Sequence, residues 1–234
     1  RGWQDEPLSS RLGEALGLPV FTANDAVVGA RAQAAFGAGR GVADLVYLYG
    51  GASGIGGGII SGGRLIQGAA GFAGQLGHTH VRTGGTACTC GSSGCLEAEV
   101  TRAALIEAVG LPAGEIENLE EVLLEKLQDG CANDKLSAVI AHQIGLLAVG
   151  LKTVMSLLNP SVIVLGGFLR ILVRAAPGVL EEALAGCGPH RPWENVKIEL
   201  APLGEDQILI GAAELVFEPL LADPAGYLQG LEGE

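Results

Sequence analysis

Residues 77–99, GHTHVRTGGTACTCGSSGCLEAE, gather two histidines, three cysteines and two glutamates in one polar segment of an otherwise apolar chain. One histidine and the cysteines have the spacing H-x9-C-x-C-x4-C, which supplies the four ligands of a tetrahedral Zn²⁺ site: His78, Cys88, Cys90 and Cys95. Four protein ligands leave no open position, so such a zinc would hold the loop 78–95 in shape rather than activate water. The competing interpretation is free thiols in a mobile loop.

Three further side chains of this segment need a role. His80 competes with His78 as the ligand, because residues i and i+2 of a strand share a face. Glu97 follows Cys95 by two residues, so a loop fixed by metal would aim its carboxylate reproducibly. Glu99 is interpreted as a solvated residue at the start of a helix.

Composition restricts the class of protein. With 234 residues and 48% hydrophobic content, the chain can bury a sizeable core, as one domain or as two lobes that share a hinge. The net charge of −12 repels polyanions, so these residues are not expected to contact nucleic acid. We find no apolar run of membrane-spanning length and no signal peptide, and we expect no membrane partner and a cytoplasmic location. Because residue 1 is arginine and Met155 is the only methionine, we expect a fragment or a processed product.

Apolar periodicity alternates between short strand-like runs and longer helical ones, which predicts an α/β architecture. We expect strands at residues 19–23, 43–49, 160–167 and 195–200, and a hairpin over residues 58–66. Helices are predicted over residues 25–39, 118–130, 134–158, 169–185 and 207–224.

The stretch AGQLGHTHVRTGGTACTCGSSGCLEAEVT, residues 73–101, resembles the signature of the ROK family of bacterial sugar kinases and sugar-responsive repressors. The resemblance extends to TANDA at 22–26, ASGIGGGII at 52–60 and LNPSVIVLGG at 158–167, and so covers almost the whole chain. It implies the two-lobed, actin-like (sugar kinase/RNase H-like) α/β fold. Residues 1–24 would then be a remnant of the N-terminal lobe, 25–206 the C-terminal lobe, and 207–234 a closing helix and tail that return to the N-terminal lobe. The family's first phosphate loop, D-x-G-x-T, does not occur in these residues.

The resemblance also implies the site residues. Asn24 and Asp25 match sugar-hydroxyl contacts, with Asp25 at the position of the general base in the kinases, where a carboxylate accepts the hydroxyl proton as the phosphoryl group arrives. Glu97 matches a sugar-binding carboxylate, and His78 matches a zinc ligand that also reaches the sugar. From sequence alone, Asn24 or Asp25 would equally serve as a helix N-cap.

One position departs from the family pattern. Where the family usually has glutamate, three residues before the histidine, this chain has Gln75. A carboxylate accepts hydrogen bonds from two hydroxyls, whereas an amide offers one acceptor and one donor group. Loss of a partner for a buried hydroxyl would cost on the order of 1–3 kcal/mol. Gln75 therefore weighs against an efficient hexose kinase and is compatible with a sensor of another ligand.

Glycine-rich turns offer a phosphate or nucleotide site. Backbone N–H groups can approach phosphate oxygens where no side chain intervenes. The candidates are Ser53, which replaces the threonine common in the family, with Gly54, Gly56, Gly57 and Gly58, and the glycine pair Gly166 and Gly167 at the end of a buried strand. A tight hairpin explains the first run equally well, and repressors of the family can retain these glycines, so they do not decide the function.

Two functions follow from the resemblance, and we favour the first. The chain would be the sugar-effector-binding part of a ROK-type transcriptional regulator, with structural Zn²⁺, a small-molecule sugar as ligand, and DNA contact only through an upstream domain absent from these residues. The alternative is part of an ATP-dependent sugar kinase that uses ATP and Mg²⁺, with Asp25 as general base. A zinc-stabilised dimerisation scaffold is a third interpretation, against which Asn24, Asp25 and Glu97 argue. The family also implies a homo-oligomer.

Overall fold

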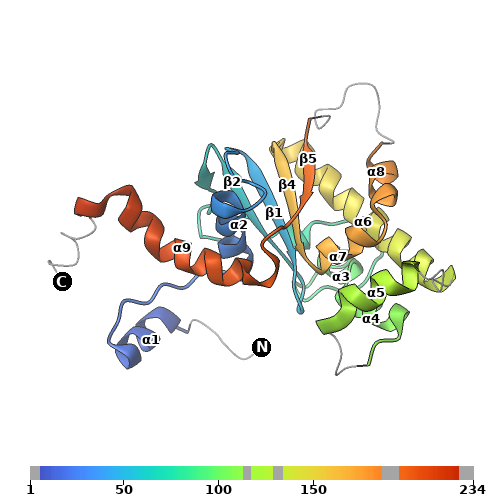
Figure 1. Ribbon diagram of the computed structural model, residues 1–234, viewed down its shortest axis with the longest axis horizontal. Coiled ribbons are helices and arrows are strands. Elements are labelled where there is room, and N and C mark those ends of the chain that lie inside the picture. Colours follow the sequence, from blue (N-terminus) through green and yellow to red (C-terminus); the bar gives the residue numbers. More distant parts are fainter. Residues whose placement is uncertain (1–5, 113–116, 129–133, 186–194, 227–234) are drawn as a thin grey trace.

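A single mixed sheet forms the centre of the protein. The computed structural model describes residues 6–112, 117–128, 134–185 and 195–226. Its strands are β1 (Leu45–Gly50), β2 (Ile55–Ser61), β3 (Arg64–Leu65), β4 (Val162–Gly167) and β5 (Lys197–Leu200), in the order β3-β2-β1-β4-β5. Strands β1, β4 and β5 are parallel, and β2 and β3 run antiparallel to their neighbours. Helices cover both faces (Figure 1), which confirms the α/β fold expected for the actin-like class.

The strand assignments follow from burial. Strands β1 and β4 are buried on both faces, so they read as continuous apolar runs rather than alternating ones. Between β2 and β3 the chain turns at Gly62 and Gly63, with φ of 57° and 75°. Positive φ at both central residues is the signature of the tight hairpin turn, and it confirms the predicted hairpin.

Helices α2 (Asp25–Phe36) and α9 (Gln207–Ala222) pack together on one face of the sheet. A Cβ added to Gly56 or Gly58 would lie 2.7 or 2.5 Å from the Cβ atom of Ala26 or Ala30 on α2. Glycine in β2 and alanine in α2 therefore bring the helix unusually close to the sheet. The first residues of α2 are held beside the β1–β2 turn as a result.

A buried polar group joins α9 to this layer. The Tyr47 hydroxyl on β1 donates to the Gln207 side-chain oxygen at 2.6 Å, and the Gln33 amide on α2 donates to the same oxygen at 3.1 Å. Burial raises the pKa of Tyr47, which keeps the hydroxyl protonated as a donor. Because all three side chains are buried, these bonds replace the water that each lost on folding.

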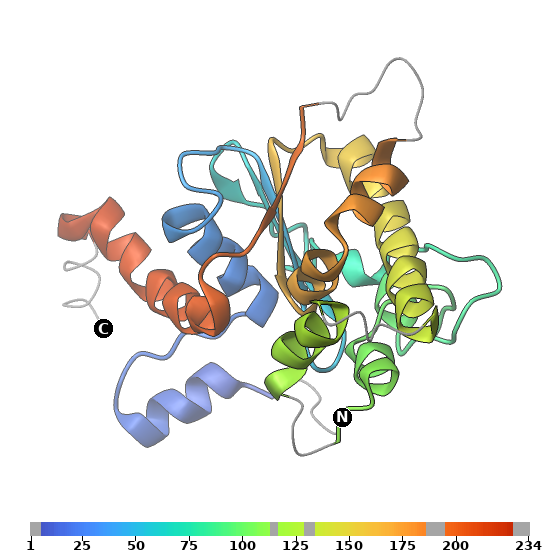
Figure 2. The same ribbon diagram turned by 45° about the vertical axis from the view of Figure 1, so that its right-hand side comes forward.

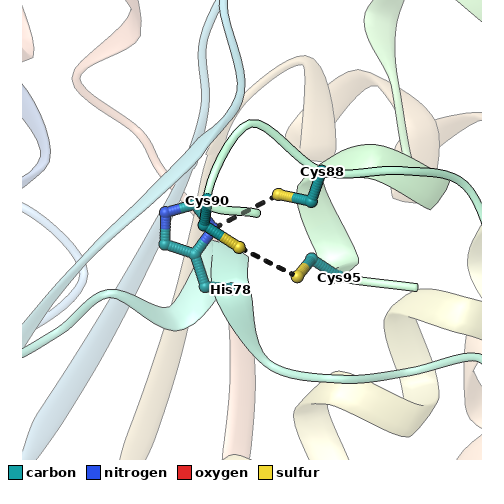
Figure 3. Close-up of side chains that lie close together, drawn as sticks. All are labelled: His78, Cys88, Cys90 and Cys95. Atoms are coloured by element: carbon teal, nitrogen blue, oxygen red, sulfur yellow. Dashed lines mark hydrogen bonds between the residues drawn. The ribbon is translucent and has the colours of Figure 1, made fainter. Parts of the chain in front are cut away.

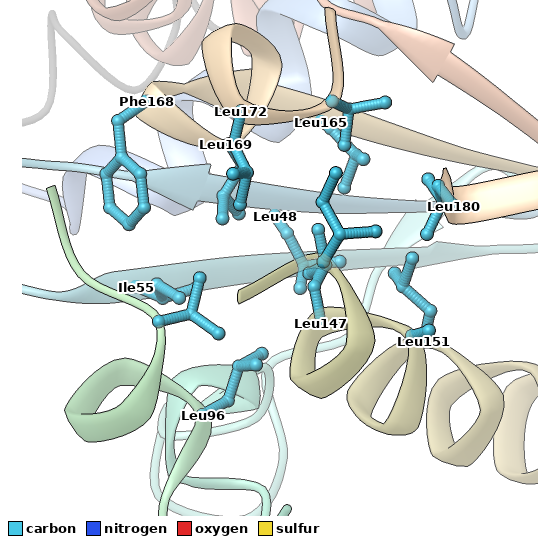
Figure 4. Packing of buried hydrophobic residues seen from close by; sticks show 14 of the residues in the cluster. Leu48, Ile55, Leu96, Leu147, Leu151, Leu165, Phe168, Leu169, Leu172 and Leu180 are labelled. Carbon is cyan, nitrogen blue, oxygen red and sulfur yellow. The ribbon is translucent and has the colours of Figure 1, made fainter. Parts of the chain in front are cut away.

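The larger core lies on the other face, where a second group of helices packs (Figures 1 and 2). They are α3 (Leu96–Glu99), α4 (Arg102–Val109), α5 (Leu119–Gln128), α6 (Asp134–Leu158), α7 (Phe168–Ala175) and α8 (Pro177–Ala185). Figure 4 shows Leu147 and Leu151 of α6 facing Leu48 and Leu165 of the sheet, and all four are fully buried. By length and composition alone α6 could cross a bilayer, which the search for apolar runs did not anticipate. Half of its apolar window is buried inside the protein, as befits a core helix.

Two predictions of secondary structure were wrong, and some helices were not predicted. Residues 19–23 form no strand: Pro19 has no N–H to donate, and within the described ranges residues 19–24 join no strand. The helix predicted over 169–185 is two helices, because Pro177 cannot donate a helical hydrogen bond and disfavours the helical conformation at Ala176, whose φ and ψ are −152° and 68°. Helix α1 (Leu8–Leu16), with none of its residues buried, and helix α4 were not predicted.

Candidate ligand site beside a cysteine and histidine cluster

The four side chains predicted to bind zinc lie together (Figure 3). His78 ends the short 3-10 helix η1 (Leu76–His78), Cys88 and Cys90 come from the following loop, and Cys95 immediately precedes α3. Bridges between His80 and Cys95 and between Ala87 and Ser93 fold the loop back on itself. The candidate ligand atoms of the four side chains all lie within 4.8 Å of one another.

Two distances between these atoms match those between ligands of a tetrahedral ion. The two sulfurs of Cys90 and Cys95 are 3.7 Å apart, and the Cys88 sulfur is 3.6 Å from His78 Nδ1. Around zinc, with metal–sulfur and metal–nitrogen bonds of about 2.3 and 2.0 Å, tetrahedral ligands are roughly 3.5–3.8 Å apart. Burial raises the pKa of the Cys95 thiol to about 12, and a cation would counter this by stabilising the thiolate. The donor set suits zinc, which would be structural there.

His80 does not take part in the cluster. Its Nδ1 lies 3.1 Å from the Ser93 carbonyl oxygen, and its Nε2 lies 3.4 Å from the Thr83 hydroxyl. Between the two candidate histidines, the geometry selects His78, and His80 instead braces the loop.

The interpretation of Glu99 as a solvated residue was wrong. Its side chain is only 3% exposed and accepts hydrogen bonds from the Thr86 backbone N–H and from Arg82, the latter at 3.3 Å. Burial opposes ionisation, but these bonds and the Arg82 charge outweigh it and lower the pKa of Glu99. Glu99 thus anchors residues 82–86 of the loop to α3. The sequence alone offered no signal for this contact.

A polar cavity of about 400 Å³ adjoins the cluster. All five predicted sugar-binding side chains line it: Asn24, Asp25, Gln75, His78 and Glu97. They come from the start of α2, from Gln75 with the adjoining η1, and from α3, so that α2 is far in sequence from the other two. The cavity is within the size range of small-molecule sites, and its lining combines carboxylate, amide and imidazole groups.

Asn24 combines the two roles considered for it. Its side-chain oxygen accepts from the Ala26 N–H at 3.0 Å, so it is the N-cap of α2, and it also lines the cavity. Asp25 is the first helical residue, and its Oδ1 also accepts from the Ala26 N–H, at 2.8 Å. Capping fixes the backbone of both residues at the cavity edge.

The glycine candidates divide into two groups. Ser53, Gly54 and Gly56 line the cavity. Gly57 and Gly58 lie within β2, outside the lining, where a Cβ on Gly57 would lie 2.6 Å from the Gly74 carbonyl oxygen. Close packing accounts for these two glycines.

The second glycine pair lies at a neighbouring cavity. Gly167 lines a space of about 270 Å³ that shares Tyr49, Gly51 and Ala52 with the first cavity. Gly166 lies beneath the Tyr47 ring, outside that lining. Arg170 also lines this second cavity and is paired with Glu120 at 2.9 Å.

Sequence reasoning missed two polar side chains of the first cavity, Tyr49 and Thr89. Tyr49 ends the apolar run of β1, and its proximity to the glycine turn was the available signal. Thr89 lies between two predicted metal ligands, a position that would have predicted a fixed backbone beside Glu97.

Several known proteins are similar to this chain over most of its length. The model of the ROK family matches residues 1–218. The "Xylose repressor" of Caldicellulosiruptor bescii is 29% identical over 95% of this chain, which spans 58% of that protein. A ROK family glucokinase from Streptomyces griseus, solved with glucose and AMPPNP, has a TM-score of 0.75 at 29% identity, covering 92% of this chain and 73% of that one. A ROK family transcriptional regulator, a homologue of the E. coli MLC protein, has a TM-score of 0.71 at 28% identity, covering 88% and 54%.

Proposed function

Since the chain belongs to the ROK family, which includes both repressors and sugar kinases, we propose that it is the sugar-effector-binding part of a transcriptional regulator. The observation that carries the sugar-binding part is the convergence of Asn24, Asp25, Gln75, His78 and Glu97 on one cavity. Sugar hydroxyls both donate and accept, and this lining offers carboxylate acceptors beside mixed amide and imidazole groups.

Gln75 supports a regulator over a kinase. It lines the cavity at the position where the family usually has glutamate, so one carboxylate acceptor for a sugar hydroxyl is replaced by an amide. A sensor needs selective binding, whereas a kinase must also hold its substrate for phosphoryl transfer. The net charge of −12 further supports DNA contact through another part of the regulator.

Ligand binding would couple two elements. Asp25 begins α2, which packs on α9, whereas His78 and Glu97 belong to the zinc loop and α3. A sugar that forms hydrogen bonds both to the start of α2 and to the loop with α3 would favour the conformation in which these two parts are closest. Sugar binding would thus shift an equilibrium between two conformations. We propose that this shift is transmitted to a DNA-binding module in a cytoplasmic homo-oligomer, with zinc held by His78, Cys88, Cys90 and Cys95.

A sugar kinase is the second candidate, and Asp25 favours it. This carboxylate lines the cavity together with Ser53 and Gly54, so an acceptor for a hydroxyl proton lies beside a candidate phosphate turn. In that case ATP would supply the phosphoryl group, with Mg²⁺ to neutralise its charge, and the glycines at 54, 56 and 167, which line the two cavities, would adjoin it.

The test measures binding and turnover on the same preparation. Isothermal titration with D-glucose and D-xylose reports binding, and a coupled assay with ATP and Mg²⁺ reports ADP release. The regulator predicts saturable sugar binding without sugar-dependent ADP release. Sugar-dependent release that Asp25→Asn abolishes would establish the kinase, and binding of neither sugar would count against both sugars as effectors.

A further inference from the structure

Thr89 holds an unassigned position between the cluster and the cavity. It lies between Cys88 and Cys90, and its side chain lines the cavity. Its hydroxyl donates to Glu97 Oε1 at 3.3 Å. A residue flanked by two metal ligands has little backbone freedom once both are bound, so its side chain can act as a fixed contact.

The two oxygens of Glu97 face different surroundings. Oε1 is surrounded by atoms of the loop: the Thr89 hydroxyl and the Cys88 sulfur are each 3.3 Å away, and His78 Nδ1 is 3.5 Å away. Oε2 faces the other way, toward Gly54 of the cavity wall, where an added Cβ would lie 2.5 Å from it. One oxygen is thus held by the loop, and the other is directed toward the candidate ligand site.

Metal chemistry changes which groups can hold Oε1. Cysteine binds a metal as thiolate, which has no proton to donate, so Cys88 cannot both ligate and donate to Glu97. His78 Nδ1 is the ring nitrogen that lies near Cys88, and a nitrogen bound to metal cannot donate either. Among the contacts of Oε1 in the described part of the chain, the Thr89 hydroxyl is the donor that metal binding does not remove.

We propose that Thr89 is a positioning residue, which holds Glu97 Oε1 so that Oε2 is presented to the sugar. The effect on sugar binding rests on the proposed function, whereas the hydrogen bond from Thr89 to Glu97 does not. Specificity follows from it, because a carboxylate held through one oxygen offers the other to a hydroxyl in a defined direction.

The experiment compares three variants of the full chain. Thr89→Val keeps the shape and removes the hydroxyl, and Thr89→Ser restores a hydroxyl. Ser92→Ala removes a hydroxyl from an exposed position of the same loop but outside the cavity lining. The measurements are zinc content per chain, titration with D-glucose and D-xylose, and the ¹³C carboxyl resonance of Glu97 in protein labelled at glutamate.

We expect all variants to retain zinc at the wild-type stoichiometry. Thr89→Val should weaken the binding of whichever sugar binds by about tenfold, because the Glu97 side chain is then no longer held in advance and must be ordered when the sugar binds. Thr89→Ser should recover most of this loss, and Ser92→Ala should bind as the wild type does. The Glu97 resonance should move or broaden in Thr89→Val alone.

Two results would overturn the inference: unchanged affinity and an unchanged Glu97 resonance in Thr89→Val, or loss of zinc in that variant, which would make Thr89 part of the metal loop's folding. If the wild type binds neither sugar, the proposed function fails for those sugars. The Glu97 resonance then still decides the positioning role, since it needs no ligand.

Discussion

Gln207→Leu should destabilise the protein strongly through two groups that it leaves without an acceptor. The Gln207 oxygen accepts from the Tyr47 hydroxyl and from the Gln33 amide, and the side chains of Tyr47 and Gln33 are fully buried. A buried donor without a partner costs about 1–3 kcal/mol, so two such donors predict a loss of about 2–6 kcal/mol in the free energy of unfolding. Urea unfolding followed by circular dichroism measures this loss.

Further variants separate the effect of the unpaired donors from the effect of lost packing at Gln207. Tyr47→Phe alone should cost only about 0.5–1.5 kcal/mol, because Gln33 still pairs with Gln207. In the Gln207→Leu variant, Tyr47→Phe removes a hydroxyl that no longer has an acceptor. There it should lower the free energy of unfolding by less than it does in the wild type, or raise it. Gln67→Leu, at an exposed position, serves as a control and should stay within about 0.5 kcal/mol of the wild type. Additive effects of the two core changes, or a loss below about 1 kcal/mol for Gln207→Leu, would refute the reasoning.

Three other perturbations test the site. Cys95→Ser should abolish stoichiometric zinc and make residues 78–95 sensitive to protease, measured by metal analysis and limited proteolysis; full zinc content in this variant would contradict the assigned ligand set. Gln75→Glu should tighten glucose binding by about tenfold or more, since it restores an acceptor, and unchanged or weaker binding in a titration would show that Gln75 does not limit affinity. The pKa of Glu99 is lowered by folding, so its stabilising effect is complete above the ordinary glutamate pKa and is lost as the pH falls through the folded value. The stability difference between wild type and Glu99→Gln should therefore shrink in urea unfolding between pH 7 and pH 3.5, and a constant difference would argue against an ionised Glu99.

Local patterns predicted most of the elements. Burial on both faces makes β1 and β4 continuous apolar runs, and Asp134–Leu158 forms the predicted long helix. The strand expected at residues 19–23 was wrong because an apolar run does not reveal whether a neighbouring strand is available for pairing. The break at Pro177 was available from the sequence and was overlooked.

Sequence motifs predicted part of the candidate site but not the contacts within its loop. The cysteine spacing anticipated the cluster, and the family resemblance anticipated the side chains that line the cavity. Contacts across the loop, such as Glu99 with Thr86 and Thr89 with Glu97, depend on the path of the folded chain and have no periodic signature. Glycines 57 and 58 show the converse, since a motif suggestive of phosphate binding also serves close packing.

The contact of Gly56 and Gly58 with Ala26 and Ala30 determines where this protein can be re-engineered. At these four positions the helix and the sheet meet through the smallest side chains, so an added methyl group would push the start of α2, and Asp25 with it, away from the cavity. Randomised libraries built on the proposed sugar site should therefore vary Gln75 and Thr89, which are exposed at the cavity, and leave these four residues unchanged. Variation at these four positions would move Asn24 and Asp25 together, whereas variation at Gln75 or Thr89 changes one side chain of the cavity at a time.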